Sequence, residues 1–330
     1  MILRIALFLA LSFHLAAAGP VLKLATAAPR GTSLHQALLE MRQKWQQAPG
    51  GGASLTIYTD GTQGGEAAVV SRMKHDQLQA AMLSVVGLAE IDPSVGALQY
   101  MPMMFRTLEE VDYVRDKIAP TLEKRLLAKN FVVLFWGDAG WVRFFSKEPG
   151  RVPADFKKMK LFTWSGDSYQ TDLMKAAGYQ PVPLEINDIL PGLQNGLITA
   201  VAQPPFFALA GQMYRPAPYM LELNWVPLVG ATVLTKKSWD AIPADAREPM
   251  LKAARDAGAR IRARSRAESN ESVDTMKKNG LKVQAVTPDI EAEWRKLAEE
   301  VYPKIRGKMV PADIFDEVLR HLKEYRKGKS

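Results

Sequence analysis

The sequence predicts an α/β protein built from two lobes, each with a parallel sheet covered by helices. Segments with strand-like and helix-like patterns alternate from residue 22 onward. The alternation starts again near residue 141, which indicates a second set of strands and helices. A helical pattern then covers 244–278. At 1.5 Å per residue such a helix would span roughly 50 Å, more than one lobe of this size, so we expect it to bridge both lobes.

The first half of the chain gives one strand or helix after another. Thr32 or Ser33 can cap a helix in which apolar side chains recur at helical spacing. The uninterrupted apolar run at 131–136 is typical of a buried parallel strand. Pro120 predicts a break in the helix around it. The strands expected in this half are 22–26, 55–59, 80–86 and 131–136, and the helices begin at Thr32 and Glu66 and cover 108–128.

The second half repeats the pattern and ends in helices. Strands are expected at 141–146, 160–164, 182–185 and 198–203. Helices are expected at 168–177, 187–195, 244–278, 288–302 and 312–325.

The first eighteen residues are typical of a secretory signal. Arg4 supplies a positive charge, residues 5–18 are largely apolar, and residues 16–18 are the small alanines that a signal peptidase needs. We expect cleavage near Ala18 and a periplasmic protein. An uncleaved N-terminal anchor is the other interpretation. No later run approaches the span of a bilayer, so stable membrane insertion is not expected.

Composition excludes several functions. The 330 residues contain no cysteine, which excludes thiol catalysis, cysteine metal sites and a lipoprotein anchor. The net charge of +8 raises the possibility of nucleic acid. However, the arginines between Arg255 and Arg266 would point to opposite sides of a helix, and export argues against this partner. We expect no nucleic-acid partner, and weak attraction to anionic lipid headgroups stays open.

The sequence lacks the motifs of an enzyme. His35, His75 and His321 show no metal-binding or catalytic spacing, and no nucleophile elbow, phosphate-binding loop or dinucleotide fingerprint is found. We therefore expect no catalysis, metal or cofactor. The glycine-rich turn at 61–66 would favour an anion at a helix start, although a plain strand-to-helix turn is the preferred interpretation. Glu66 already complements that helix end.

Candidate ligand-binding residues follow strands, because α/β lobes bind ligands at the carboxyl ends of their strands. Gln203 ends a strand and leads into a loop with two prolines, Phe206 and Phe207. Core packing is the other interpretation for these residues. Four more aromatic residues lie at or near strand ends: Trp136, Trp141, Phe162 and Trp164.

Five short segments, in this order, resemble those of one known family. They are QGGE at 63–66, WGDAGW at 136–141 with FFS at 144–146, FKKMKL at 156–161, GLQNGL at 192–197 and LTKKSW at 234–239. The chain resembles the DctP-type substrate-binding proteins of tripartite ATP-independent periplasmic (TRAP) transporters. The resemblance implies a two-lobed periplasmic binding protein fold with hinge strands and a long shared helix. It also implies closure around a small-molecule ligand and handover to membrane permease subunits driven by an ion gradient.

The resemblance and the pattern together predict how the chain divides. After the signal at 1–18, lobe I takes 21–139 and lobe II takes 140–227. The chain then returns to lobe I at 228–267, crosses to lobe II at 268–295, and places its C-terminal helices, 296–330, on lobe I.

The departures from the family are concentrated where it holds a ligand carboxylate. The resemblance implies an arginine at the position of Phe162 and a second one at the position of Val142. Arg143 is shifted by one residue, so on a strand it faces the other way unless a bulge redirects it. The family's asparagine before the glycine is Ala139 here, and its Glu-Asn pair is replaced by alanine and Gln203.

These changes replace charge by apolar surface, so we expect a hydrophobic ligand: lipid-like, terpenoid or aromatic. Gln203, Thr163, Ser165 and Tyr169 would orient one hydroxyl or carbonyl group of it. Other interpretations stay open. A rebuilt carboxylate site could use Arg72, Arg106 or Arg143, and a ligand sensor subunit could share the fold. A hydrolase is the least favoured, because no nucleophile–histidine arrangement is found.

Overall fold

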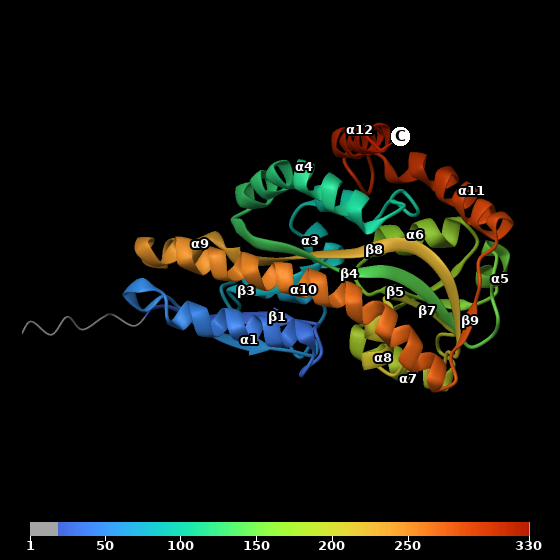
Figure 1. Ribbon diagram of the computed structural model, residues 1–330, viewed down its shortest axis with the longest axis horizontal. Coiled ribbons are helices and arrows are strands. Elements are labelled where there is room, and N and C mark those ends of the chain that lie inside the picture. The colour runs from blue at the N-terminus through green and yellow to red at the C-terminus, as the bar shows by residue number, and fades with distance from the viewer. Residues whose placement is uncertain (1–18, 330) are drawn as a thin grey trace, which may run out of the picture.

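The computed structural model describes residues 19–329 (Figure 1). The expected signal at 1–18 lies outside the described residues. Within them the strands are β1 (Val21–Thr26), β2 (Ser54–Tyr58), β3 (Ala80–Ser84), β4 (Phe131–Ser146), β5 (Lys160–Trp164), β6 (Gln180–Leu184), β7 (Ala200–Gln203), β8 (Tyr219–Thr235) and β9 (Lys282–Gln284).

Helices fill most of the remaining chain. The α-helices are α1 (Ser33–Gln46), α2 (Glu66–Lys74), α3 (Val85–Ala89), α4 (Leu108–Ala128), α5 (Pro153–Lys157), α6 (Ser168–Ala176), α7 (Ile189–Asn195), α8 (Pro205–Ala210), α9 (Lys236–Asp240), α10 (Ala244–Lys278), α11 (Pro288–Ile305) and α12 (Ala312–Lys327). Three short 3-10 helices are η1 (Pro49–Gly51), η2 (Pro93–Leu98) and η3 (Ile186–Asp188).

The strands form one mixed sheet that runs through both lobes. Its order is β2-β1-β3-β8-β4-β7-β5-β6, with β9 beside the other end of β8. β1 pairs in parallel with β2 and β3 in lobe I, and β5 pairs in parallel with β6 and β7 in lobe II. The antiparallel strands β4 and β8 join the two halves, so they are the hinge strands. The predicted pair of α/β lobes is confirmed, with antiparallel strands at their junction.

Two expectations about the strands were wrong. The segments 131–136 and 141–146 are one strand, β4, because the residues between them continue the pairing with β8. Gly140 adopts φ +78°, and the register shifts between Asp138 and Trp141, so the glycines form a bulge instead of a break. β8 was not predicted at all. The predicted lobe boundaries at 139–140 and 227–228 fall inside these two strands, and they stay predictions.

The break expected at Pro120 does not occur, and α4 continues through it. Ile118, Leu122 and Leu126 are fully buried on either side of the proline. Packing of this stripe against the lobe I core holds both halves in line although the proline removes one backbone hydrogen bond.

The long helix α10 bridges the lobes, as expected (Figure 1). It packs on α1 in lobe I and on α8 in lobe II, and it crosses β4 between them. Trp45 of α1 donates from Nε1 to the carbonyl oxygen of Met250 at 2.9 Å, which fixes the two helices together. The helices α4, α11 and α12 cover the other face of the sheet, and α12 packs on α4.

Candidate ligand-binding site

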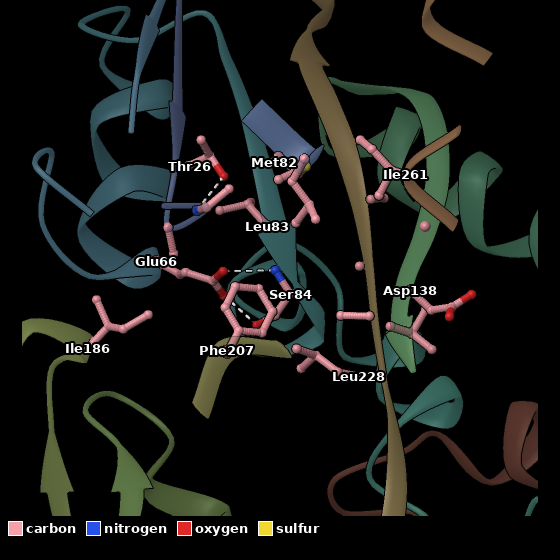
Figure 2. A pocket seen from close by; sticks show the side chains of 18 of the residues that line it. Thr26, Glu66, Met82, Leu83, Ser84, Asp138, Ile186, Phe207, Leu228 and Ile261 are labelled. Carbon is pink, nitrogen blue, oxygen red and sulfur yellow. Dashed lines mark hydrogen bonds between the residues drawn. The ribbon is translucent and has the colours of Figure 1, made fainter. Parts of the chain in front are cut away.

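A first cavity lies where the ends of β1 and β3 meet the hinge strands (Figure 2). It holds about 690 Å³, its mouth included. Apart from a few polar groups its walls are apolar. Lobe I and the hinge contribute Thr26, Ala27, Ala28, Leu34, Glu66, Met82, Leu83, Ser84, Phe135, Gly137, Asp138, Ala139, Val229, Gly230, Ala231 and Ile261, and lobe II adds Ile186 and Phe207.

A second cavity lies beside it, under α6 and α11, and holds about 1110 Å³ with its mouth. Its walls are again apolar and rich in aromatic rings. They include Tyr100, Pro102, Val142, Phe144, Leu161, Phe162, Thr163, Leu173, Met174, Ala177, Tyr179, Ala202, Trp225, Val226, Trp294, Leu297, Val301, Ile305 and Met309, with Gln99 and Gln170.

Three residues border both cavities: Trp164, Gln203 and Leu228. Trp164 ends β5 and Gln203 ends β7, so the parallel strands of lobe II bring them to the same edge of the sheet. Leu228 belongs to the hinge strand β8. The two cavities therefore adjoin at the strand ends where the sequence predicts a ligand.

The lobes touch each other around this site. The Tyr100 hydroxyl of lobe I donates to Asp167 Oδ2 of lobe II at 2.9 Å. Burial raises the pKa of Asp167, while its hydrogen bonds with Gln170 and Tyr100 act in the opposite direction. At the start of α2, a Cβ on Gly65 would lie 2.1 Å from Glu185 Oε2 of lobe II. A carboxylate of the protein already occupies the helix end at which an anion was considered.

Among the described residues that line the two cavities, none is a lysine or an arginine. The acids among them are Glu66 and Asp138, both in the first cavity. A carboxylate ligand there would meet two acids and no cation.

Glu66 is bound within lobe I. Its Oε1 accepts from the Ser84 amide at 2.8 Å, and its Oε2 accepts from the Ser84 hydroxyl at 2.6 Å and the Gly87 amide at 2.8 Å. Glu66 as a whole is partly buried, and protein surrounds its carboxylate. This burial raises the pKa of Glu66, and the three hydrogen bonds only partly offset it.

The carboxylate of Asp138 is paired with an arginine that does not line the cavity among the described residues. Arg266 of α10 donates from Nε to its Oδ1 at 3.1 Å and from Nη2 to its Oδ2 at 2.7 Å. The same arginine donates to both carboxylate oxygens of Asp112. In Figure 2 the Asp138 carboxylate is turned away from Glu66. Nε, Nη1 and Nη2 of Arg266 thus all donate to carboxylates of the protein.

The three arginines considered for a rebuilt anion site lie outside both cavities. Arg72 donates from Nη1 to Gln63 Oε1 at 2.8 Å. Arg106 borders a separate recess together with Arg295. Arg143 lies 3.9 Å from Glu222, and burial lowers its pKa while Glu222 opposes that change. The bulge next to Arg143 has not turned it into a cavity.

The predicted site residues divide into two groups. Those that border a cavity are Ala139, Val142, Phe162, Trp164, Gln203 and Phe207. Those that border neither are Arg72, Trp136, Trp141 and Phe206. Trp136 instead packs in lobe I and donates to Glu123 Oε1 at 2.9 Å. Phe206 packs under α10 and contacts Phe207 edge to face.

The polar residues expected to orient a ligand are also divided. Gln203 and Thr163 border the second cavity, but Ser165 and Tyr169 border neither cavity, and Tyr169 is 65% exposed. Sequence reasoning predicted the helix α11 but not that its Trp294 and Leu297 border the second cavity, and it did not single out Leu228.

Comparison with known proteins places the chain in a family. The family model described as "Bacterial extracellular solute-binding protein, family 7" (DctP) matches residues 24–308. The 2,3-diketo-L-gulonate-binding periplasmic protein YiaO of Escherichia coli is 23% identical over 255 residues, which are 76% of each protein.

Solved structures share the fold. A TRAP periplasmic solute-binding protein of Shewanella oneidensis with bound succinate has a TM-score of 0.85 at 17% identity, covering 92% of this chain and 100% of the other. One from Xanthobacter autotrophicus with bound β-D-galacturonate has a TM-score of 0.84 at 18% identity, covering 92% and 99%. The ligands named for these proteins are acids, which runs against the hydrophobic ligand that the sequence predicts. At such low identity the likeness extends to the fold alone.

Within residues 19–329, no helix is both long and apolar enough to cross a bilayer. In the same part of the chain, no cluster of three or more histidines and acids could hold a metal ion. Members of the matched family are periplasmic, generally have no catalytic activity, and work with membrane permease components. The match covers most of the sequence, and the fold agrees with it. The chain belongs to the DctP family and is an extracytoplasmic solute-binding protein of the TRAP type.

Proposed function

We propose that this protein captures a neutral, mainly apolar molecule (lipid-like, terpenoid or aromatic) and delivers it to a TRAP permease. The observation that carries the proposal is the absence of lysine and arginine among the described residues bordering the two cavities. Phe162 and Val142 border the second cavity at the positions where the family resemblance implies arginines.

The energetics favour such a ligand. A carboxylate buried without a partner costs several kcal/mol or takes up a proton. Burying about 200 Å² of apolar ligand surface instead contributes roughly 5 kcal/mol at 25 cal/mol per Å². Apolar walls with a few polar groups are typical of sites for small apolar molecules.

A carboxylate ligand is the second candidate, and Arg143 is the observation in its favour. Its Nε is buried and has no hydrogen-bond partner, and Glu222 is 3.9 Å away. Arg143 is also the direct cross-strand partner of Gln203, and such partners point to the same face of the sheet. Arg143 therefore lies on the face of Gln203, which borders both cavities, although Arg143 is not among the described residues that line them. A ligand sensor subunit could bind the same ligand. Genes for permease subunits beside the gene of this protein would favour transport over sensing.

The direct test is to identify what the protein carries. The protein is exported by its own bacterium, purified without added ligand, denatured, and the extract is analysed by mass spectrometry. We expect a neutral apolar compound in near-stoichiometric amount. Recovery of a dicarboxylate or a sugar acid at that level would contradict the proposal. A Trp164→Ala sample prepared in parallel is the control, because loss of this wall should deplete a genuine cavity ligand but leave surface contaminants.

A further inference from the structure

Gln203 carries an unpartnered donor at the point where the two cavities adjoin. The residue is 4% exposed, and its Nε2 has no hydrogen-bond partner among the residues that the structure describes. It borders both the first and the second cavity. Buried amide groups are nearly always hydrogen-bonded, because an unmade bond costs free energy. A ligand that extends through both cavities past Gln203 can supply the missing acceptor.

The two cavities offer separate spaces on either side of Gln203. They measure about 690 Å³ and about 1110 Å³ when the open space at their mouths is counted. Apolar walls extend from Gln203 in two directions, towards Met82 and Ile261 in one cavity and towards Trp294 and Leu297 in the other.

The second cavity has one more unpartnered polar group. The hydroxyl of Tyr179 is buried without a hydrogen-bond partner. Burial raises the pKa of Tyr179 to about 12, so the hydroxyl stays neutral and can donate or accept. The ligand segment in this cavity can therefore carry a hydroxyl or carbonyl group without a charge.

We propose that the ligand is an elongated neutral molecule with two apolar arms on either side of an acceptor oxygen, as in a ketone, an ester or an ether. Gln203 donates to the oxygen, and one arm fills each cavity. This inference rests on the proposed function, because it assumes that the cavities take an apolar ligand.

Three probes of equal chain length test the position of the oxygen: 6-undecanone, 2-undecanone and undecane. Binding is followed by tryptophan fluorescence, since Trp164, Trp225 and Trp294 border the cavities. We expect 6-undecanone to bind about tenfold more tightly than the other two, the size of one hydrogen bond. In Gln203→Leu this preference should vanish while undecane still binds, which also shows that the variant is folded.

Two matched substitutions test the arms. Ala27 borders the first cavity and Ala177 the second, and both are half-buried, so a leucine at either position fills space in one cavity only. Each of Ala27→Leu and Ala177→Leu should weaken 7-tridecanone about tenfold and spare the shorter 5-nonanone. Ala176→Leu is the control, since Ala176 is exposed and borders neither cavity.

The outcomes separate the two proposals. Equal binding of the three undecane-length probes, or a loss of 7-tridecanone binding in only one of the two cavity variants, would overturn the two-armed ligand and leave an apolar ligand standing. Failure of every neutral probe to bind the wild-type protein would overturn the proposed function, and this inference with it.

Discussion

Residues of the strand β4 belong both to the charged cluster around Arg266 and to the walls of the two cavities. Polar groups are paired with one another in the cluster, whereas some of those at the cavities are left unpaired. In the cluster, Arg266 donates to Asp138 and Asp112, and Arg115 donates to Asp112 as well. In the cavities, as far as residues 19–329 are concerned, Gln203 has an unpaired donor, and no lysine or arginine lines the cavity that Glu66 borders. The guanidinium groups of the cluster come from α10 and α4 and pair with carboxylates of the protein.

This difference shows why net charge alone does not tell which ligand a site would take. The chain has a net charge of +8, yet Arg266, which pairs with the cavity residue Asp138, donates to two carboxylates of the protein. Whether a charge is available depends on which partners the fold brings to it. The predictions below test this contrast between the charged cluster and the cavities.

The largest effect is expected from Arg266→Ala. The Asp138 side chain is fully buried, so loss of its partner leaves an unpaired charge inside the protein. We expect the free energy of unfolding to fall by roughly 3 kcal/mol, the low end for a broken buried pair, because water reaches Asp112. Urea unfolding measures the change. Lys252→Ala on the same helix is the control, since its solvent-exposed pair with Asp256 should contribute little to stability.

Trp164→Ala should have the largest effect on binding. Its ring borders both cavities and contacts Phe162 edge to face at 5.2 Å between ring centroids. Removal of such an aromatic wall typically costs about 2 kcal/mol, or roughly 30-fold in affinity. Titration with 6-undecanone checks this. Tyr169→Ala is the matched control on the exposed surface, and equal losses in both variants would show that the cavities are not the site.

Phe162→Arg restores a positive charge at the position where the family resemblance implies an arginine, so it tests whether that charge decides the ligand class. Phe162 borders the second cavity and packs on the apolar core of lobe II. A guanidinium there should weaken binding of 6-undecanone about tenfold and raise the affinity for succinate, because its paired donors match a carboxylate. Phe162→Leu separates the charge from the lost ring, and urea unfolding verifies that both variants fold. Unchanged affinity for both ligands would remove Phe162 from the site.

Arg72→Ala should change affinity by less than about twofold, since Arg72 is bonded to Gln63 and borders neither cavity. The same titrations with 6-undecanone and succinate check it. A clear loss of succinate binding would instead restore Arg72 as an anion-binding residue.

The two regions should also respond oppositely to pH. Burial raises the pKa of Glu66 above its ordinary 4.5, so its contribution to stability is complete below that value and is lost as the pH rises through the raised pKa. For Asp112, burial acts to raise the pKa, but the hydrogen bond of Arg266 and the charge of Arg115 outweigh it and lower the pKa. Its contribution is complete above pH 3.8 and is lost as the pH falls.

Unfolding measured across pH checks both signs. The stability advantage of the wild type over Glu66→Gln should shrink as the pH rises from about 4.5, and its advantage over Asp112→Asn should shrink as the pH falls below about 4. Each unit of pKa difference between the folded and unfolded states corresponds to about 1.4 kcal/mol. The same sign for both residues would contradict the contrast between cavity and cluster.

Much of the fold was predictable because it depends on local patterns. The strand–helix alternation predicted the two lobes, and the uninterrupted helical pattern of α10 predicted the bridge. β8 was missed because it passes from a lobe edge to the core. Its buried residues do not alternate regularly, and Pro227 lies within it. Register shifts in the pairing with β4 disturb the pattern further.

The site was predictable only at its strand ends. The rule that ligands bind at the carboxyl ends of strands found Trp164 and Gln203. It could not find Trp294 or Leu297, because the apolar stripe of α11 is typical of any helix that packs on a core. The rule also selected Trp136, which packs inside lobe I. Only the packing of distant segments decides which apolar residues border a space.

The central claim is that the cavities hold no positive charge for an acid, and one pair of isomers tests it most directly. Methyl decanoate and undecanoate contain the same heavy atoms and differ in carrying no charge or one charge. In calorimetric titrations at pH 8 we expect methyl decanoate to bind at least about 100-fold more tightly, with the gap closing as acid protonates undecanoate. Tighter binding of undecanoate at pH 8 would show that a cation faces the ligand and would contradict the account.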